Sequence, residues 1–136
     1  MKEVPNGFHP HFRKSPLTDP WEPLYSKIAD ETITLGLFAS AQHCNARGLV
    51  HGGLISALAD NALGLSCAKQ HTPQGGLVTI SLNLEFLKAP KLGEWMEFVT
   101  SHTKIGRSID FAQGYVTSDG ERCANVSASF AVPRTE

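Results

Sequence analysis

Two glycines and one acidic residue stand where the sequence could support chemistry at a carbonyl group. Gly52 and Gly53 open a run with helical spacing, and Asp60 lies in the middle of that run between apolar residues. Backbone N–H groups at a helix start have no intrahelical acceptor and lie at the positive end of the helix dipole. They can stabilise an oxygen that becomes negative, and the missing glycine side chains let that oxygen approach closely. A carboxylate is unfavourable in an apolar helix, which favours a functional role for Asp60 as a base or nucleophile.

Each of these features also has a structural interpretation. A glycine pair often marks a plain junction between a loop and a helix. Asp60 could form a structural ion pair with Arg47 or Lys69, and Asn45 could hydrogen-bond the backbone of its own loop, as asparagine does in Asx turns. The glycine pair combined with His51 and Asp60 favours the chemical interpretation, whereas Asn45 stays open between the two.

The helix that carries these residues is predicted from apolar spacing. From Gly52 to about Lys69, apolar residues recur at helical intervals and cover much of the circumference, which predicts a buried helix. The remaining face carries small residues and one carboxylate, at Gly53, Ser56, Asp60, Gly64 and Cys67. Such a stripe lets another backbone or a ligand come close.

Strands are expected on both sides of this helix. The run 25–40 predicts one or two strands, 41–53 a loop, and 77–87, 94–104, 107–118 and 121–132 four strands. Strict alternation at 78–86 and 124–132 predicts one core face for each of these two strands, and Asp119-Gly120 predicts a hairpin turn. Prolines at the N-terminus leave room for one short helical turn but not for a long element. The prediction is an α+β fold, with a proline-rich arm at 1–24 and a single domain at 25–136.

Composition limits the classes of function. The chain has 136 residues and is 41% hydrophobic, which fits one domain with a single core. The 12 Lys and Arg residues against 13 Asp and Glu leave no broad basic field for nucleic acid. No apolar stretch approaches the roughly 18 residues of a membrane span, and no segment of signal-peptide type opens the sequence. A cytoplasmic protein without nucleic-acid or membrane partners is therefore expected.

Cysteine and histidine patterns predict neither disulfides nor a metal site. Cys44, Cys67 and Cys123 are odd in number and lack a CxxC spacing, so buried free thiols are expected. The histidines outside the glycine motif show neither helical pair spacing nor a nearby carboxylate pattern; they are His9, His11, His43, His71 and His102. Serine-hydrolase and nucleotide-hydrolase classes lack their usual motifs, because no GxSxG run or phosphate-binding loop occurs.

One motif resembles a known family. The run Asn45-Ala-Arg-Gly48-Leu-Val-His51-Gly52-Gly53, with Asp60 nine residues after His51, resembles the hotdog-fold thioesterases of the PaaI-like (phenylacetate-degradation) and mammalian thioesterase-superfamily type. The resemblance covers about residues 25–133. It implies a hotdog fold, in which a curved antiparallel sheet wraps one long helix. It also implies hydrolysis of an acyl-CoA or aryl-CoA thioester to the free acid and CoA, with no cofactor beyond the CoA of the substrate.

The resemblance assigns roles to the motif residues. It implies that the Gly52 N–H, helped by His51 and Asn45, polarises the thioester carbonyl. Asp60 would act as nucleophile or as general base toward water, and the sequence does not choose between these mechanisms.

Further site residues follow from the same resemblance. Thr79 aligns with a hydroxyl residue that helps to hold the attacking water, although strict alternation turns it away from the face of Val78 and Ile80 unless a bulge intervenes. A local cation near the tunnel mouth would suit the phosphates of CoA. Candidate contacts to the substrate are Gly53, Lys88, Lys91, Lys104 and the Gly106-Arg107-Ser108 turn.

Helix geometry predicts a site shared by two chains. Gly52 and Asp60 are eight residues apart, which is about 12 Å along one helix. A reacting carbon cannot lie within about 3 Å of both on a straight helix. Two antiparallel helices related by a twofold axis near Ser56 would bring Asp60 of one chain beside Gly52 of the other. A homodimer is therefore expected, and relatives of this type often pair dimers into tetramers.

Two alternatives to hydrolysis stay open: a non-catalytic acyl-CoA-binding module on the same fold, and a hotdog dehydratase or hydratase. Asp60 favours hydrolysis, because a binding module needs no acid beside the scissile carbonyl. The acyl group itself is not identified, although seven Phe, two Trp and the arm would suit an aryl or medium-chain group.

Overall fold

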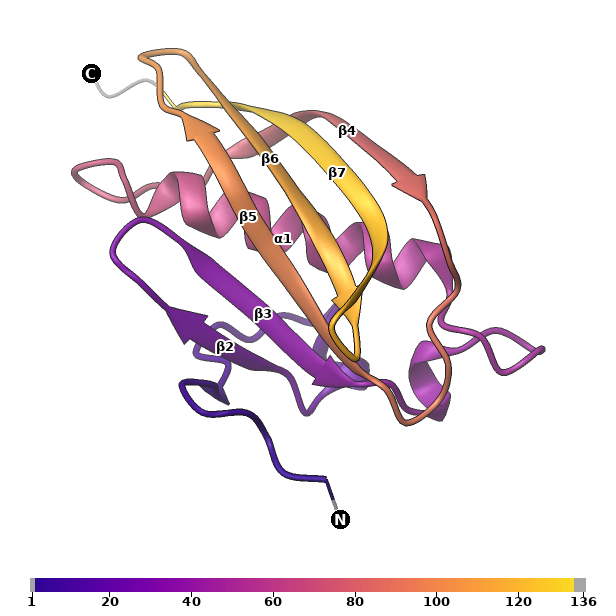
Figure 1. The fold of residues 1–136 in the computed structure, drawn as a ribbon. Helices are drawn as coiled ribbons and strands as arrows, with labels where there is room; N and C mark the ends of the chain where they lie inside the picture. The colour runs from indigo at the N-terminus through magenta and orange to yellow at the C-terminus, as the bar shows by residue number, and fades with distance from the viewer. Residues whose placement is uncertain (1, 134–136) are drawn as a thin grey trace.

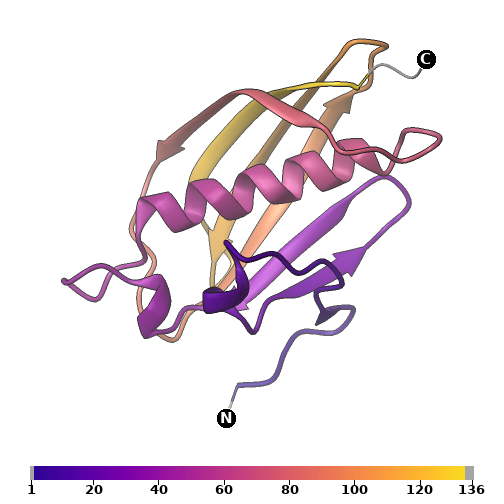
Figure 2. The same ribbon diagram turned by 180° about the vertical axis from the view of Figure 1, so that it is seen from behind.

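One long helix wrapped by a curved sheet is the central feature of the computed structural model, which describes residues 2–133 (Figure 1). Helix α1 (Gly52–Ala68) packs on the inner face of a seven-stranded sheet with strand order β1-β2-β3-β5-β6-β7-β4. All neighbouring strands are antiparallel. Seen from behind, α1 lies in front of the strands (Figure 2). The predicted α+β arrangement is confirmed.

The observed elements follow the predicted ones closely. The strands are β1 (His9–Pro10), β2 (Tyr25–Ile28), β3 (Ile33–Phe38), β4 (Val78–Phe86), β5 (Trp95–Lys104), β6 (Ile109–Ser118) and β7 (Glu121–Ala131), and two 3-10 turns are η1 (Asp19–Trp21) and η2 (Ala41–His43). The region 25–40 holds two strands. Asp119 and Gly120 both have positive φ, as the predicted hairpin turn between β6 and β7 requires.

The core lies between α1 and the sheet. Apolar side chains along one side of the helix are buried against β3, β5, β6 and β7. Ser66 adds a polar anchor, because its hydroxyl accepts from the Ile33 N–H at 3.0 Å and hydrogen-bonds the Thr100 hydroxyl at 2.8 Å. These contacts hold the helix in register with β3 and β5.

Strand β4 departs from the expected strict alternation. Thr79 pairs with Phe130 and Ser81 pairs with Ser129, so Ile80 is an extra residue in a β-bulge. The prediction of one core face over 78–86 is wrong at this end, since Val78 is 67% exposed and Ile80 is 55% exposed. The bulge shifts the phase of the strand, and it turns Thr79 toward α1.

The N-terminal arm is packed onto the domain. Phe8 is buried, β1 pairs with β2, and the His11 N–H donates to the Leu24 carbonyl at 2.9 Å. The arm lies on the same side of the sheet as α1 (Figure 2). No helix within residues 2–133 has both the length and the apolar character needed to cross a membrane.

Candidate active site

The N–H groups at the start of α1 differ in their hydrogen bonds. His51 is the N-cap, and its Nδ1 accepts a hydrogen bond from the Gly53 N–H at 2.8 Å. The Gly53 N–H is therefore occupied by the side-chain cap, a contact that the residue types alone did not predict. The Gly52 N–H has no hydrogen-bond partner within residues 2–133. Because Nδ1 accepts, a neutral His51 carries its proton on Nε2 and can donate it outward.

Asn45 organises the loop before the helix. Its Oδ1 accepts from the Arg47 N–H at 2.9 Å and from the Leu49 N–H at 3.2 Å. Its backbone N–H donates to the Leu49 carbonyl at 2.8 Å. These contacts are the loop-forming role that the sequence left open, and a role in chemistry stays a prediction.

Asp60 is held by a hydroxyl group. The Thr79 hydroxyl donates to Asp60 Oδ1 at 2.7 Å, and Asp60 itself is half-buried. Among the described residues Asp60 forms no ion pair, so the alternative of a structural pair with Arg47 or Lys69 is not supported. A carboxylate with one fixed oxygen and no cation keeps its other oxygen available for a proton or a carbon.

A cavity of about 280 Å³ lies beside this pair. Asp60 and Thr79 are part of its wall, together with Gly64 of α1 and the segment Gly75–Leu77 before β4. The sequence did not predict a further part of the wall, which the N-terminal arm supplies through His11, Arg13, Ser15 and Thr18. No local pattern could have found these residues, because their place depends on how the arm folds back over the helix.

Within one chain, the expected site residues fall into three groups. Asn45, the glycine pair and Lys88 lie at the end of the molecule where α1 starts, as the packing of Phe86 beside Gly52 shows. The Gly106-Arg107-Ser108 turn lies at the other end, because Ile109 and Val78 both pair with Ala131. Asp60 and Thr79 lie between, toward the second end. One chain therefore does not bring all the expected residues together.

The basic residues expected to contact the substrate have different surroundings at the two ends of the molecule. Lys88 forms an ion pair with Glu121. Arg107 and Ser108 are exposed, and the Gly106 N–H donates to Asp110 Oδ1 at 2.9 Å. Asp110 is fully buried and also hydrogen-bonds His71 Nε2 at 2.6 Å, so this pair fixes the turn against the end of α1.

The thiols are poorly suited to act as nucleophiles. Cys67 and Cys123 are fully buried, and burial raises the pKa of Cys67 to about 12 and the pKa of Cys123 to about 11. Cys44 is only half-buried, which differs from the expectation of three buried thiols. Residues 2–133 hold no group of three side chains suited to bind a metal ion.

Comparison of the sequence with known proteins identifies the family. The model of the thioesterase superfamily matches residues 47–124. A Pseudomonas aeruginosa protein named "Putative esterase PA0474" is 37% identical over 134 residues, which cover 98% of this chain and 100% of that protein. Acyl-coenzyme A thioesterase 13 of Homo sapiens is 30% identical over 79 residues, or 57% of this chain and 54% of that protein.

Solved structures share the fold. Phenylacetic acid degradation protein PaaI of Thermus thermophilus, in a mutant form, superposes with a TM-score of 0.77 at 21% identity and covers 88% of this chain and 100% of its own. A hypothetical thioesterase of Streptococcus pneumoniae, solved with coenzyme A, gives a TM-score of 0.70 at 20% identity, over 83% of this chain and 88% of its own. The predicted hotdog fold is confirmed, and the chain belongs to the thioesterase superfamily.

The contacts of Asn45 generate a stability prediction. Asn45→Ala removes an acceptor shared by two backbone N–H groups, so the free energy of unfolding should fall by about 1 kcal/mol. Asn45→Asp keeps the acceptor and is the matched control, with an expected change within about 0.5 kcal/mol. Urea denaturation measures both changes. Equal stability of the alanine variant and the wild type would contradict the loop-forming role.

Proposed function

We propose that this chain is an acyl-CoA thioesterase, which hydrolyses an acyl-CoA or aryl-CoA thioester to the free acid and CoA. The observation that carries the proposal is the Asp60 carboxylate in the wall of the cavity. The Thr79 hydroxyl donates a hydrogen bond to this carboxylate at 2.7 Å, and no cation pairs with it in the described chain. Membership of the thioesterase superfamily supports thioester hydrolysis in general. The coenzyme A bound to the Streptococcus pneumoniae protein supports a CoA thioester as substrate.

In the proposed reaction, the Gly52 N–H receives the carbonyl oxygen as it becomes negative. The helix dipole and the outward Nε2 of His51 would add to this stabilisation. Asp60 would either attack the carbonyl carbon, giving an anhydride that water then hydrolyses, or take a proton from water as the water attacks. In both routes the C–S bond breaks and the CoA thiolate leaves. Thr79 would orient the carboxylate, and both routes stay open.

The proposed site is shared between two chains of a homodimer. Gly52 and Asp60 lie on one continuous helix, which puts their backbones about 12 Å apart. The side of α1 that the sheet leaves uncovered carries Gly53 and Ser56, which are small enough for a second helix to approach. An antiparallel second copy would place its Asp60 beside Gly52 of the first.

Strand β4 gives independent support for a second copy. It is one of the two edge strands of the sheet, and Val78, Ile80 and Phe86 expose apolar side chains along it. Long apolar edge strands are uncommon in monomers, because their free N–H and C=O groups pair with other chains. Pairing with a second β4 would cover this edge.

Several finer points belong to the same proposal. Arg107, Ser108 and Gly106 would contact the nucleotide part of CoA, with Gly53 and Lys88 near the other end of the substrate path. The reaction would need water but no metal or added cofactor. A pairing of dimers into tetramers and a cytoplasmic location stay predictions from the sequence.

Asp60→Asn tests the proposed chemistry. A carboxamide keeps the shape and can still accept from Thr79, but it cannot act as base or nucleophile. We expect kcat on a responsive acyl-CoA to fall at least about 100-fold while the Kd of the substrate changes little. Asp30→Asn makes the same change at an exposed position that does not line this cavity, and as the matched control it should leave kcat within about twofold of the wild-type value. Wild-type turnover of Asp60→Asn would refute the mechanism.

Complementation tests the shared site. Asp60→Asn chains are mixed in equal amounts with His51→Ala chains under conditions where subunits exchange. Half of the random dimers are then mixed, and each mixed dimer has one intact site, so activity should recover to about a quarter of the wild-type value. Absence of recovery, with exchange demonstrated by differently tagged chains, would place His51 and Asp60 in one chain's site.

A further inference from the structure

The cavity beside Asp60 extends across α1 to the N-terminal arm. Figure 1 and Figure 2 both show α1 lying between β4 on one side and the arm on the other. The lining residues follow the same path, from Thr79 through Asp60 and Gly64 to His11 and Arg13. Its volume of about 280 Å³ is near the lower end for small-molecule pockets, about 300–1,000 Å³. The far wall of the cavity, opposite the candidate catalytic pair, therefore belongs to the arm.

His11, which lies in this wall, is a buried polar side chain with one ring nitrogen that lacks a hydrogen-bond partner within the described residues. It is 5% exposed, and its buried Nδ1 has no hydrogen-bond partner within the described residues. Burial lowers the pKa of His11 below its usual range, with a smaller opposite effect of Glu22, and the ring is neutral near pH 7. Buried polar atoms in native proteins are nearly always hydrogen-bonded, so an unused one at a cavity points to a ligand.

Arg13 is the positively charged residue in the same wall of the cavity. The residues lining the cavity include one cation, Arg13, and one carboxylate, Asp60. Among residues 2–133 Arg13 forms no ion pair, whereas its neighbour Lys14 pairs with Glu22 at 3.0 Å. A guanidinium binds a carboxylate with two parallel hydrogen bonds. The arm end of the cavity thus favours an anion.

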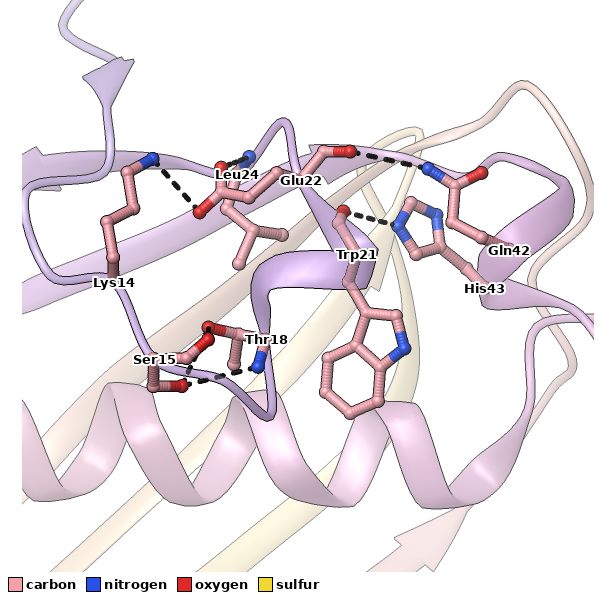
Figure 3. Close-up of polar contacts among 8 residues, drawn as sticks. All are labelled: Lys14, Ser15, Thr18, Trp21, Glu22, Leu24, Gln42 and His43. Atoms are coloured by element: carbon pink, nitrogen blue, oxygen red, sulfur yellow. Dashed lines mark hydrogen bonds and ion pairs between the residues drawn. The ribbon is translucent and has the colours of Figure 1, made fainter.

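The arm is held firmly enough to serve as a wall. Figure 3 shows His43 Nε2 bonded to the Trp21 carbonyl at 2.8 Å, and the Ser15 hydroxyl bonded to the Thr18 hydroxyl at 2.9 Å. Glu22 Oε1 accepts from the Leu24 N–H at 2.7 Å. The His43 bond joins the segment around η1 to the domain, and the other two bonds brace that segment internally. The His11 N–H also donates to the Leu24 carbonyl at 2.9 Å, so the backbone at His11 belongs to a fixed structure.

We propose that His11 and Arg13 bind a carboxylate at the far end of the acyl group, so that this chain prefers thioesters of short dicarboxylic acids. Leu24, Leu35, Leu58 and Leu65 line the cavity and would contact the methylene groups between the two ends. The inference rests on the proposed function, because Asp60 defines the reacting end.

Matched substrates test the preference. The CoA thioesters of glutarate, adipate and suberate are compared with pentanoyl-, hexanoyl- and octanoyl-CoA, which replace the terminal carboxylate with a methyl group. We expect kcat/KM for at least one dicarboxylic substrate to exceed that of its partner about tenfold, as one charge-assisted hydrogen bond supplies. Arg13→Gln and His11→Phe should each lower this ratio, the first by about tenfold. Lys14→Gln is the control, and it should keep the ratio within about twofold because Lys14 does not line the cavity.

A binding measurement separates this inference from the proposed function. The Kd values of each matched pair are measured by calorimetry on Asp60→Asn protein, where turnover does not interfere. The inference is supported if a dicarboxylic thioester binds more tightly than its methyl-ended partner and Arg13→Gln abolishes this difference in Kd. That result would stand even if no substrate is hydrolysed and the proposed function fails. Equal or weaker binding of every dicarboxylic thioester overturns the inference, even if methyl-ended thioesters are hydrolysed.

Discussion

A straight helix holds the two ends of the candidate site apart, and the rest of the structure is arranged around that separation. Gly52 and Asp60 are both on α1, with about 12 Å of helix between them. The helix cannot bend to join them, because its inner side is packed along its length against β3, β5, β6 and β7. Chemistry that needs both groups at one carbon therefore needs a second helix. The uncovered small residues of α1 and the unpaired edge of β4 are the features that admit it.

The bulge in β4 is the local feature that brings the Thr79 hydroxyl into hydrogen-bonding distance of the Asp60 carboxylate. With regular alternation, Thr79 would lie on the outer face of the sheet with Ser81. The extra residue Ile80 changes the phase, and the Thr79 hydroxyl reaches Asp60 Oδ1 at 2.7 Å. The exposure of Ile80, at 55%, accompanies this change. One inserted residue in β4 thus places the Thr79 hydroxyl beside Asp60, near the middle of α1.

Sequence patterns were sufficient for the elements but not for their finer contacts. The spacing of apolar residues located α1 and the strands after it, and the Asp119-Gly120 pair located the hairpin turn, because these patterns are local. The sequence indicated only that Thr79 would need a bulge in order to face the helix. It did not predict the bulge itself, because a one-residue shift depends on the pairing of β4 with β7. The His51 cap on Gly53 and the loop bonds of Asn45 depend on side-chain geometry that residue types leave open.

The arm shows most clearly what a sequence pattern leaves out. Its prolines correctly indicated that it has no long element, but nothing local connects residue 11 with residue 60. That connection depends on long-range contacts such as the bond from His43 to the Trp21 carbonyl. The arm consequently belongs to the cavity wall as much as α1 does.

A crystal structure of Asp60→Asn protein with an unhydrolysed acyl-CoA substrate tests the shared site most directly. The account predicts a twofold dimer in which the thioester oxygen accepts from the Gly52 N–H of one protomer. The thioester carbon would then lie within about 3–3.5 Å of the side chain at position 60 of the other protomer. A thioester bound between Gly52 and position 60 of the same chain, or in a monomer, would contradict it.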